Sequence, residues 1–172
     1  MRTFSQRIRA AILVDASLYE EVEADRSATG AAMLVVVLSS LATGLGVGAR
    51  QGVTGLVAGS VAALIGWFLW AGLTHLIGTR LLPTPDTVST WGQVLRTTGF
   101  SAAPGLFRLF AFVPGVWGLL IYYVATVWML VAFVVAVRQA LDYRSTWRAV
   151  GVCLTGWLVF VVLLNVYVIA LS

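Results

Sequence analysis

The chain has 172 residues, of which 60% are hydrophobic and only 10% are charged, whereas an ordinary soluble domain carries roughly 25% charged residues. This composition excludes a water-soluble globular fold and indicates an integral membrane protein. The net charge of +4 results from 11 arginines and seven acidic residues. The arginines lie at the ends of apolar segments and in short connections, so we interpret them as signals of membrane topology and not as a nucleic-acid-binding surface.

The N-terminal segment, residues 1–27, mixes charged residues with apolar residues at near-helical spacing. The apolar positions that carry this pattern are Phe4, Ile8, Ile12 and Tyr19. We expect one amphipathic helix from Thr3 to Glu23 that lies on the cytoplasmic membrane interface, with Asp15 as an imperfection in its apolar face. We interpret the acidic cluster at its end as a solvated turn, the alternative being a docking surface for a basic partner. The cluster consists of Glu20, Glu21, Glu23 and Asp25.

The rest of the chain, residues 28–172, is one domain built from five apolar segments. Each has about the length that a helix needs to cross a bilayer, and a helix satisfies its own backbone hydrogen bonds in lipid. The segments run from Ala28 to Ala49, Val53 to Ile77, Thr97 to Val113, Val116 to Val137 and Ala149 to Leu171. The sequence therefore predicts an all-α bundle of five transmembrane helices.

Small residues recur along the first two predicted spans. They are Gly44 and Gly48 in the first span, and Gly55, Gly59 and Ala63 in the second. Because small residues at this spacing let helix backbones approach closely in lipid, we expect the two spans to pair through them, around a tight turn at residues 50–52. A homodimer face is the alternative use of the same stripe.

The third predicted span is short and contains Pro104 and Arg108. As an α-helix it would be only about 25 Å long at 1.5 Å per residue, so a re-entrant hairpin is an alternative. Five crossings place nine arginines on the cytoplasmic side and only Arg50 and Arg108 outside, whereas the hairpin gives seven against four. The positive-inside rule favours five crossings, with the N-terminus in the cytoplasm and the C-terminus outside. We expect the Arg108 guanidinium to reach the outer headgroups.

Few residues in the spans can carry chemistry. No Asp or Glu falls within them, which argues against a proton-coupled transporter, an intramembrane aspartyl protease or a carboxylate metal site. We interpret His75, the only histidine, as a hydrogen-bonded neutral imidazole, the alternative being an axial ligand to a haem or chlorin. Asn165 is expected to cross-link helices. The sequence thus predicts a protein that is not an enzyme and binds no metal or cofactor apart from lipid.

A resemblance to a known family rests on the order of several short motifs. His75 and Leu76 lie at the end of the second apolar segment, which is followed by a polar connection. Residues 91–104 then read Trp-Gly-Gln-Val-Leu-Arg-Thr-Thr-Gly-Phe-Ser-Ala-Ala-Pro, and a turn at 113–115 reads Val-Pro-Gly. This pattern resembles the bacterial branch of the Yip (Ypt-interacting protein) domain family along 7–171. The motif positions are His75, Gln93, Arg96, Gly99, Phe100, Pro104 and Pro114.

The resemblance implies a five-span protein of the bacterial cytoplasmic membrane with a cytoplasmic N-terminus. Eukaryotic members of the family are associated with Rab-type GTPases and form hetero-oligomers. Their long cytoplasmic N-terminal region has no counterpart in the sequence, so we do not expect GTPase binding.

Two functions remain open from the sequence. The first is a scaffold or accessory subunit that contacts lipids, other membrane subunits or a second copy of itself, and no nucleic acid. The second is a passage for lipid or a small solute through a polar groove. That groove would be formed by His75, Pro104, Arg108 and Asn165.

Overall fold

The computed structural model describes residues 1–47 and 52–171, with side chains up to residue 162. The described residues form helices and connections and contain no strand. The α-helices are α1 (Phe4–Ile12), α2 (Ala16–Ala24), α3 (Ala28–Gly46), α4 (Gly52–Leu76), α5 (Trp91–Phe100), α6 (Val116–Ala140) and α7 (Thr146–Leu171). A π-helical turn, η1 (Ile77–Leu81), extends α4, and a 3-10 helix, η2 (Ala103–Phe112), follows α5.

Three helices of the described residues are long and apolar enough to cross a membrane: Ala28–Gly46, Gly52–Leu81 and Val116–Ala140. They match the first, second and fourth predicted spans. The part of α7 whose side chains are described, Thr146–Val162, is a shorter apolar helix. The all-helical fold and its apolar, membrane-type helices are therefore confirmed, whereas the number of five crossings stays a prediction.

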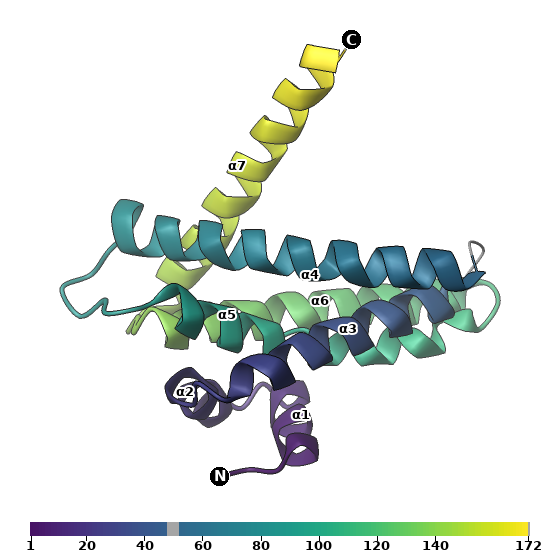
Figure 1. Ribbon diagram of the computed structural model, residues 1–172, viewed down its shortest axis with the longest axis horizontal. Coiled ribbons are helices and arrows are strands. Elements are labelled where there is room, and N and C mark those ends of the chain that lie inside the picture. Colours follow the sequence, from purple (N-terminus) through teal and green to yellow (C-terminus); the bar gives the residue numbers. More distant parts are fainter. Residues whose placement is uncertain (48–51, 172) are drawn as a thin grey trace.

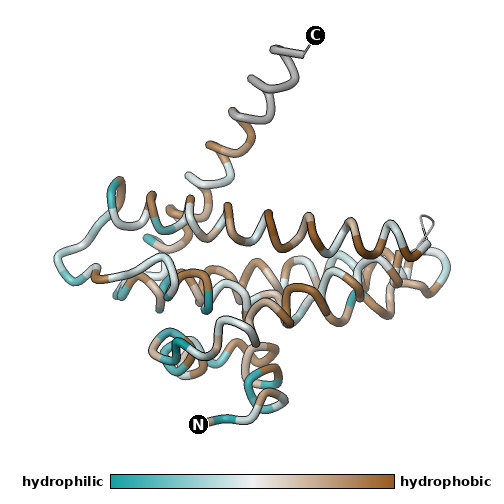
Figure 2. The backbone as a smooth tube through the Cα atoms, viewed as in Figure 1, coloured by the Kyte–Doolittle hydropathy of each residue, from teal (hydrophilic) through white to brown (hydrophobic). Residues whose placement is uncertain are grey.

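The bundle consists of α3, α4 and α6 lying alongside one another, with η2 packed between α3 and α6 (Figure 1). Helices α1 and α2 lie beneath α3 and α5, and α7 leaves the other helices at a steep angle. Apolar residues dominate the long helices, whereas hydrophilic residues concentrate in α1, α2 and the connection between η1 and α5 (Figure 2).

The third predicted span is wrong as a continuous α-helix over Thr97–Val113. The chain forms the α-helix α5, which begins six residues earlier, and then the 3-10 helix η2. Pro104 explains the change, because proline has no N–H to donate and its ring clashes with the preceding turn of an α-helix. It is tolerated at the start of η2, where it stands within the first two positions.

The single amphipathic helix predicted over Thr3–Glu23 is also wrong, because two helices replace it. The break lies at Val14, which has a φ of 55°, a left-handed conformation that no helix continues through. Asp15 then caps α2, since its side chain accepts a hydrogen bond from the backbone N–H of Ser17. Asp15 is thus a helix start signal and not an imperfection in an apolar face.

Glycine allows three helices to meet near the C-terminal end of α5. A Cβ on Gly99 would lie 2.8 Å from Cβ of Ala32 in α3 and 2.9 Å from the ring of Trp67 in α4. The same Trp67 donates its indole N–H to the Leu95 carbonyl at 3.1 Å and lies 3.2 Å from the Thr98 hydroxyl. Helix α5 is therefore wedged between α3 and α4 and fixed by a buried hydrogen bond.

We predict that Gly99→Ala destabilises the protein by about 1 to 3 kcal/mol, the usual cost of forcing extra atoms into a packed core. The matched control is Gly66→Ala in α4, where an added Cβ meets nothing within 4 Å, so that only the helix propensity gain of about 0.5 to 1 kcal/mol remains. Thermal unfolding in a mild detergent measures both. Equal midpoints for the two variants would contradict the wedged arrangement.

Candidate functional site

The start of α5 is organised by a reciprocal cap between Thr90 and Gln93. The Gln93 side-chain oxygen accepts the Thr90 backbone N–H at 2.6 Å, and the Thr90 hydroxyl accepts the Gln93 backbone N–H at 3.4 Å. This capping box fixes the Gln93 amide. Its NH₂ group is then free to donate to the carboxylate of Glu23 in α2, at 2.9 Å.

Arg96, one turn later, binds the end of α2. Its Nε donates to the Val22 carbonyl at 2.8 Å, and its Nη2 donates to the Glu23 carbonyl. Carbonyls in the last turn of a helix have no partner within the helix and carry partial negative charge. The buried Arg96 guanidinium therefore caps α2 and holds it against α5.

The acidic residues of α2 and its C-terminal cap are paired within the protein. Arg7 lies 2.9 Å from the Glu21 carboxylate and 2.7 Å from that of Asp25, while Glu20 accepts a hydrogen bond from Gln139 of α6 at 2.8 Å. The interpretation of this cluster as a solvated turn is therefore wrong. Its carboxylates bind α2 to α1, α5 and α6.

Three of these four carboxyl groups have shifted pKa values, and that of Glu21 is lowered by hydrogen bonds from the Arg2 backbone and the Arg7 side chain. Hydrogen bonds from Ser27 and then from Arg7 lower the pKa of Asp25 to about 2. Burial, together with the negative charge of Asp142, raises the pKa of Glu23 to about 7. A carboxyl group whose pKa is raised on folding favours the folded state at low pH, so the Glu23 contribution to stability declines as the pH rises from about 4.5 to 7.

A second polar group, around Arg108 in η2, lies at the other end of the bundle. Its Nη2 donates to the Thr126 hydroxyl at 2.9 Å and its Nη1 to the Thr43 hydroxyl at 3.4 Å. Its Cζ lies 4.9 Å from the centre of the Tyr122 ring, which is within the range of a cation–π contact. Arg108 has no carboxylate partner among the described residues, and its buried Nε has no acceptor.

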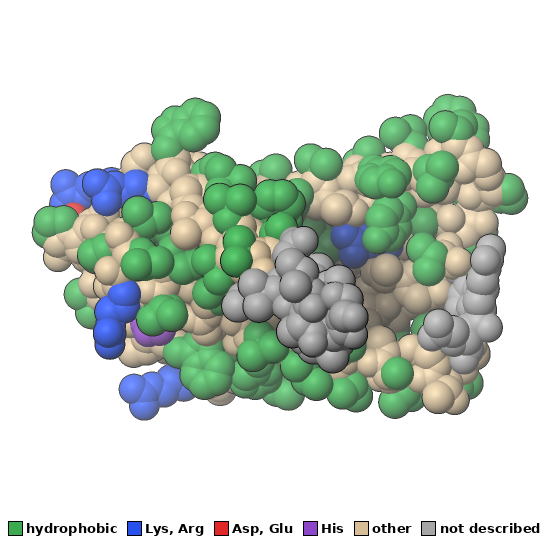
Figure 3. All heavy atoms as spheres, turned by 90° about the horizontal axis from the view of Figure 1, so that it is seen from above, with side chains coloured by type: hydrophobic (Ala, Val, Ile, Leu, Met, Phe, Trp, Pro, Cys, Tyr) green, Lys and Arg blue, Asp and Glu red, His purple; other side chains and the backbone are tan. Residues whose placement is uncertain are grey.

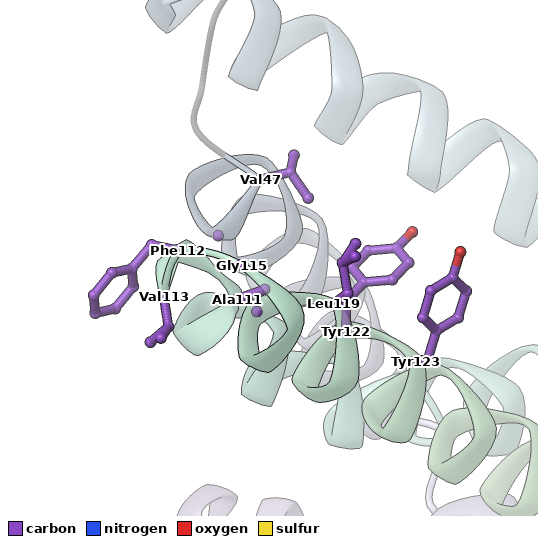
Figure 4. A pocket seen from close by; sticks show the side chains of 10 residues that line it. Val47, Ala111, Phe112, Val113, Gly115, Leu119, Tyr122 and Tyr123 are labelled. Atoms are coloured by element: carbon purple, nitrogen blue, oxygen red, sulfur yellow. The ribbon is translucent and has the colours of Figure 1, made fainter.

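A partly open cavity of about 450 Å³ lies next to Arg108, which does not line it but contacts two of its lining residues, Gly46 and Tyr122. Its walls come from the end of α3, the end of η2 and the start of α6, and the rings of Tyr122 and Tyr123 project from α6 toward the neighbouring helix (Figure 4). In the space-filling view a hollow opens among apolar side chains, and arginine atoms are visible inside it (Figure 3). The arginine whose Nε–H has no acceptor among the described residues thus lies close to a cavity with mostly apolar walls.

Two residues of the predicted groove, His75 and Arg108, lie at opposite ends of the bundle. Arg108 lies beside the C-terminal end of α3, because its carbonyl oxygen is where a Cβ on Gly46 would lie. His75 lies near the opposite end of the bundle, at the end of α4, and its Nδ1 is buried without a partner. Pro104 is buried at the start of η2, and the side chain of Asn165 lies outside the described residues.

The small-residue stripe lies partly between α3 and α4. A Cβ on Gly44 would lie 2.6 Å from the Leu56 side chain, and a Cβ on Gly59 would lie 3.9 Å from the Ser40 hydroxyl. Gly55 and Ala63 are half-buried on α4, and Gly48 lies outside the described residues. Helices α3 and α4 therefore approach each other at the first of these glycines.

The motif residues serve packing and helix capping more than chemistry. Phe100 and Pro104 are buried, and Gly99 lets α5 pack closely against α3 and α4. Pro114 precedes Gly115, whose φ of 77° turns the chain from η2 into α6. Nothing in the sequence distinguishes Thr43, Tyr122 and Thr126 as site residues, since single hydroxyls scattered over apolar helices give no motif.

Comparison with known proteins finds a single kind of match. The family model of the Yip1 domain matches residues 15–167. No curated protein and no solved structure matches the chain. Within the part of the chain that the structure describes, no three His, Cys, Asp or Glu side chains gather in a way that could hold a metal ion.

We predict that Arg96→Gln releases α2 from the bundle. Hydrogen bonds from charged groups contribute about 1.5 to 3 kcal/mol, so amide hydrogen exchange of residues 16–24 should accelerate by about tenfold to a hundredfold. The control is Arg144→Gln, which breaks an exposed ion pair with Asp86 and should leave α2 unchanged. Unaltered exchange in the Arg96 variant would contradict the capping role.

Proposed function

Because the chain belongs to the Yip1 domain family of membrane proteins, we propose that it is a non-enzymatic scaffold or accessory subunit that acts through contacts with lipids and with other membrane helices. The observation that carries this proposal is an apolar stripe on α4. The stripe consists of Val53, Val57, Val61, Ile65 and Leu69, all exposed and spaced four residues apart. Only 17% of the apolar window of this helix is buried within the protein, so lipid or another helix must cover it in a membrane.

The proposed topology is five crossings in a bacterial cytoplasmic membrane, with the N-terminus inside. Two contacts support a crossing by α5 and η2: Gly99 lies beside Ala32 and Arg108 lies beside Gly46. The segment thus runs parallel to α3, from near its start to its end. Its two helices together are about 35 Å long at 1.5 Å and 2.0 Å per residue, enough for the roughly 30 Å hydrocarbon core.

This topology predicts that a cysteine introduced at Ser172, with Cys153 replaced by serine, reacts with a membrane-impermeant maleimide added outside intact cells. The reason is the arginine distribution. It places the N-terminus and the connections after the second and fourth spans in the cytoplasm, and therefore the C-terminus outside. Labelling only after the cells are opened would contradict five crossings.

The proposed function is tested by purifying the tagged full chain from native membranes in a mild detergent and identifying companions by mass spectrometry. We expect other membrane subunits or a second copy to co-purify. Val57→Phe combined with Val61→Phe should remove that companion by reshaping the stripe. The matched control is Val127→Phe with Val131→Phe, two equally exposed positions on α6. A wild-type protein that elutes alone as a monomer would refute the proposal.

A second candidate function, passage of lipid or a small solute, is favoured by the cavity beside Arg108. Broken or irregular helices at membrane depth normally line cavities or lie buried in protein, and η2 borders this one. Lipid scrambling or solute flux in liposomes tests it. Transport that does not change after Arg108→Gln and Pro104→Ala would remove its support.

A further inference from the structure

The Arg108 guanidinium has more hydrogen-bond donors than the described residues satisfy. A guanidinium carries five N–H donors and no acceptor. Thr43 and Thr126 each accept one hydrogen bond, and the buried Nε has no acceptor at all. All seven acidic residues of the chain lie outside η2, α3, α4, α6 and α7, so no internal carboxylate can neutralise this cation.

The two threonines orient the guanidinium rather than compete for a ligand. Thr43 donates its own hydroxyl proton to the Ser39 carbonyl at 2.8 Å, and Thr126 donates to the Tyr122 carbonyl at 2.7 Å. Their oxygens are therefore fixed as acceptors for Arg108, and the Tyr122 ring supports the guanidinium from one side. A guanidinium group held in a fixed orientation can bind two oxygens of one anion, such as a phosphate.

The position of Arg108 in η2 matches the depth of a phospholipid phosphate. Arg108 lies four residues before Phe112, the last residue of η2, which is about 8 Å at 2.0 Å per residue. A long arginine side chain at that depth reaches the boundary between acyl chains and headgroups. A phosphate here would relieve the cost of an unpaired arginine in lipid.

The neighbouring cavity has the size and lining for the headgroup of such a lipid. Its volume of about 450 Å³ falls within the usual range of ligand sites. Val47 and Leu119 form apolar walls, while the hydroxyls of Tyr122 and Tyr123 provide polar atoms (Figure 4). We propose that Arg108 and this cavity bind the phosphodiester headgroup of an anionic phospholipid. This inference deepens the lipid contact of the proposed function and rests on it.

Native mass spectrometry of the full chain, reconstituted with phosphatidylglycerol, tests the proposal. The wild-type protein should retain phosphatidylglycerol, and Arg108→Gln should retain it about tenfold less or weaker still, as expected for the loss of a charged hydrogen bond. Arg80→Gln is the matched control, since Arg80 is exposed at the end of η1. Diacylglycerol, which lacks the phosphate, should not be retained by any of the three proteins.

If Arg108→Gln does not elute as a monodisperse protein, Leu119→Trp provides the second variant, because it fills the cavity from an exposed position and leaves Arg108 in place. It should also lose the lipid. Equal retention by all variants, or displacement of the lipid by an equal concentration of inorganic phosphate, would overturn the proposal. Wild-type protein that keeps its protein companions but retains no lipid would overturn this inference alone, and leave the scaffold function standing.

Discussion

The carbonyl groups at the end of α2 need donors, and Arg96 supplies them from a neighbouring helix. This contact decides how the N-terminal part of the chain relates to the apolar bundle. Once the Val22 and Glu23 carbonyls are capped, the apolar face of α2, with Leu18, Tyr19 and Val22 fully buried, lies against protein instead of lipid. Burying three such side chains contributes several kcal/mol, about 1.5 to 3 kcal/mol for each of the large ones.

The same helix that carries Arg96 also determines the path of the following segment. Helix α5 fits between α3 and α4 because Gly99 has no side chain, and Pro104 ends the α-helical geometry shortly afterwards. The chain continues along α3 as the 3-10 helix η2, whose longer rise per residue carries it to the end of α3. Arg108 arrives beside Thr43 for this reason.

The two polar regions of the protein are therefore satisfied in different ways. Near α2, arginines meet carboxylates and carbonyls, so that the charges are neutralised within the chain. Near Arg108, the partners among the described residues are two hydroxyls and a tyrosine ring, and the buried Nε–H has no acceptor there. An arginine without an internal carboxylate is tolerated in an apolar protein where an external anion reaches it. The region around Arg108 therefore indicates a ligand site, whereas the region around α2 serves stability.

Much of this architecture follows from the sequence alone. The apolar runs that became α3, α4 and α6 exceed the length of a membrane crossing, and in lipid a long apolar segment has no alternative to a helix. The capping box at Thr90 and Gln93 is equally local, because both partners lie within one turn. By contrast, the break between α1 and α2 and the change of helix type in the third predicted span do not follow from hydrophobic periodicity, which does not register a left-handed residue such as Val14 or the effect of a proline.

Only the tertiary structure decided the partners of the polar side chains. Arg96 and Val22 are 74 residues apart, and Arg108 and Thr43 are 65 residues apart, so their contacts depend on how whole helices pack. The apolar pattern determined that the chain belongs in a membrane, because hydrophobicity acts residue by residue. The capped end of α2 and the half-satisfied arginine beside a cavity emerged only from folding, because a hydrogen bond requires two groups to be brought within about 3 Å of each other.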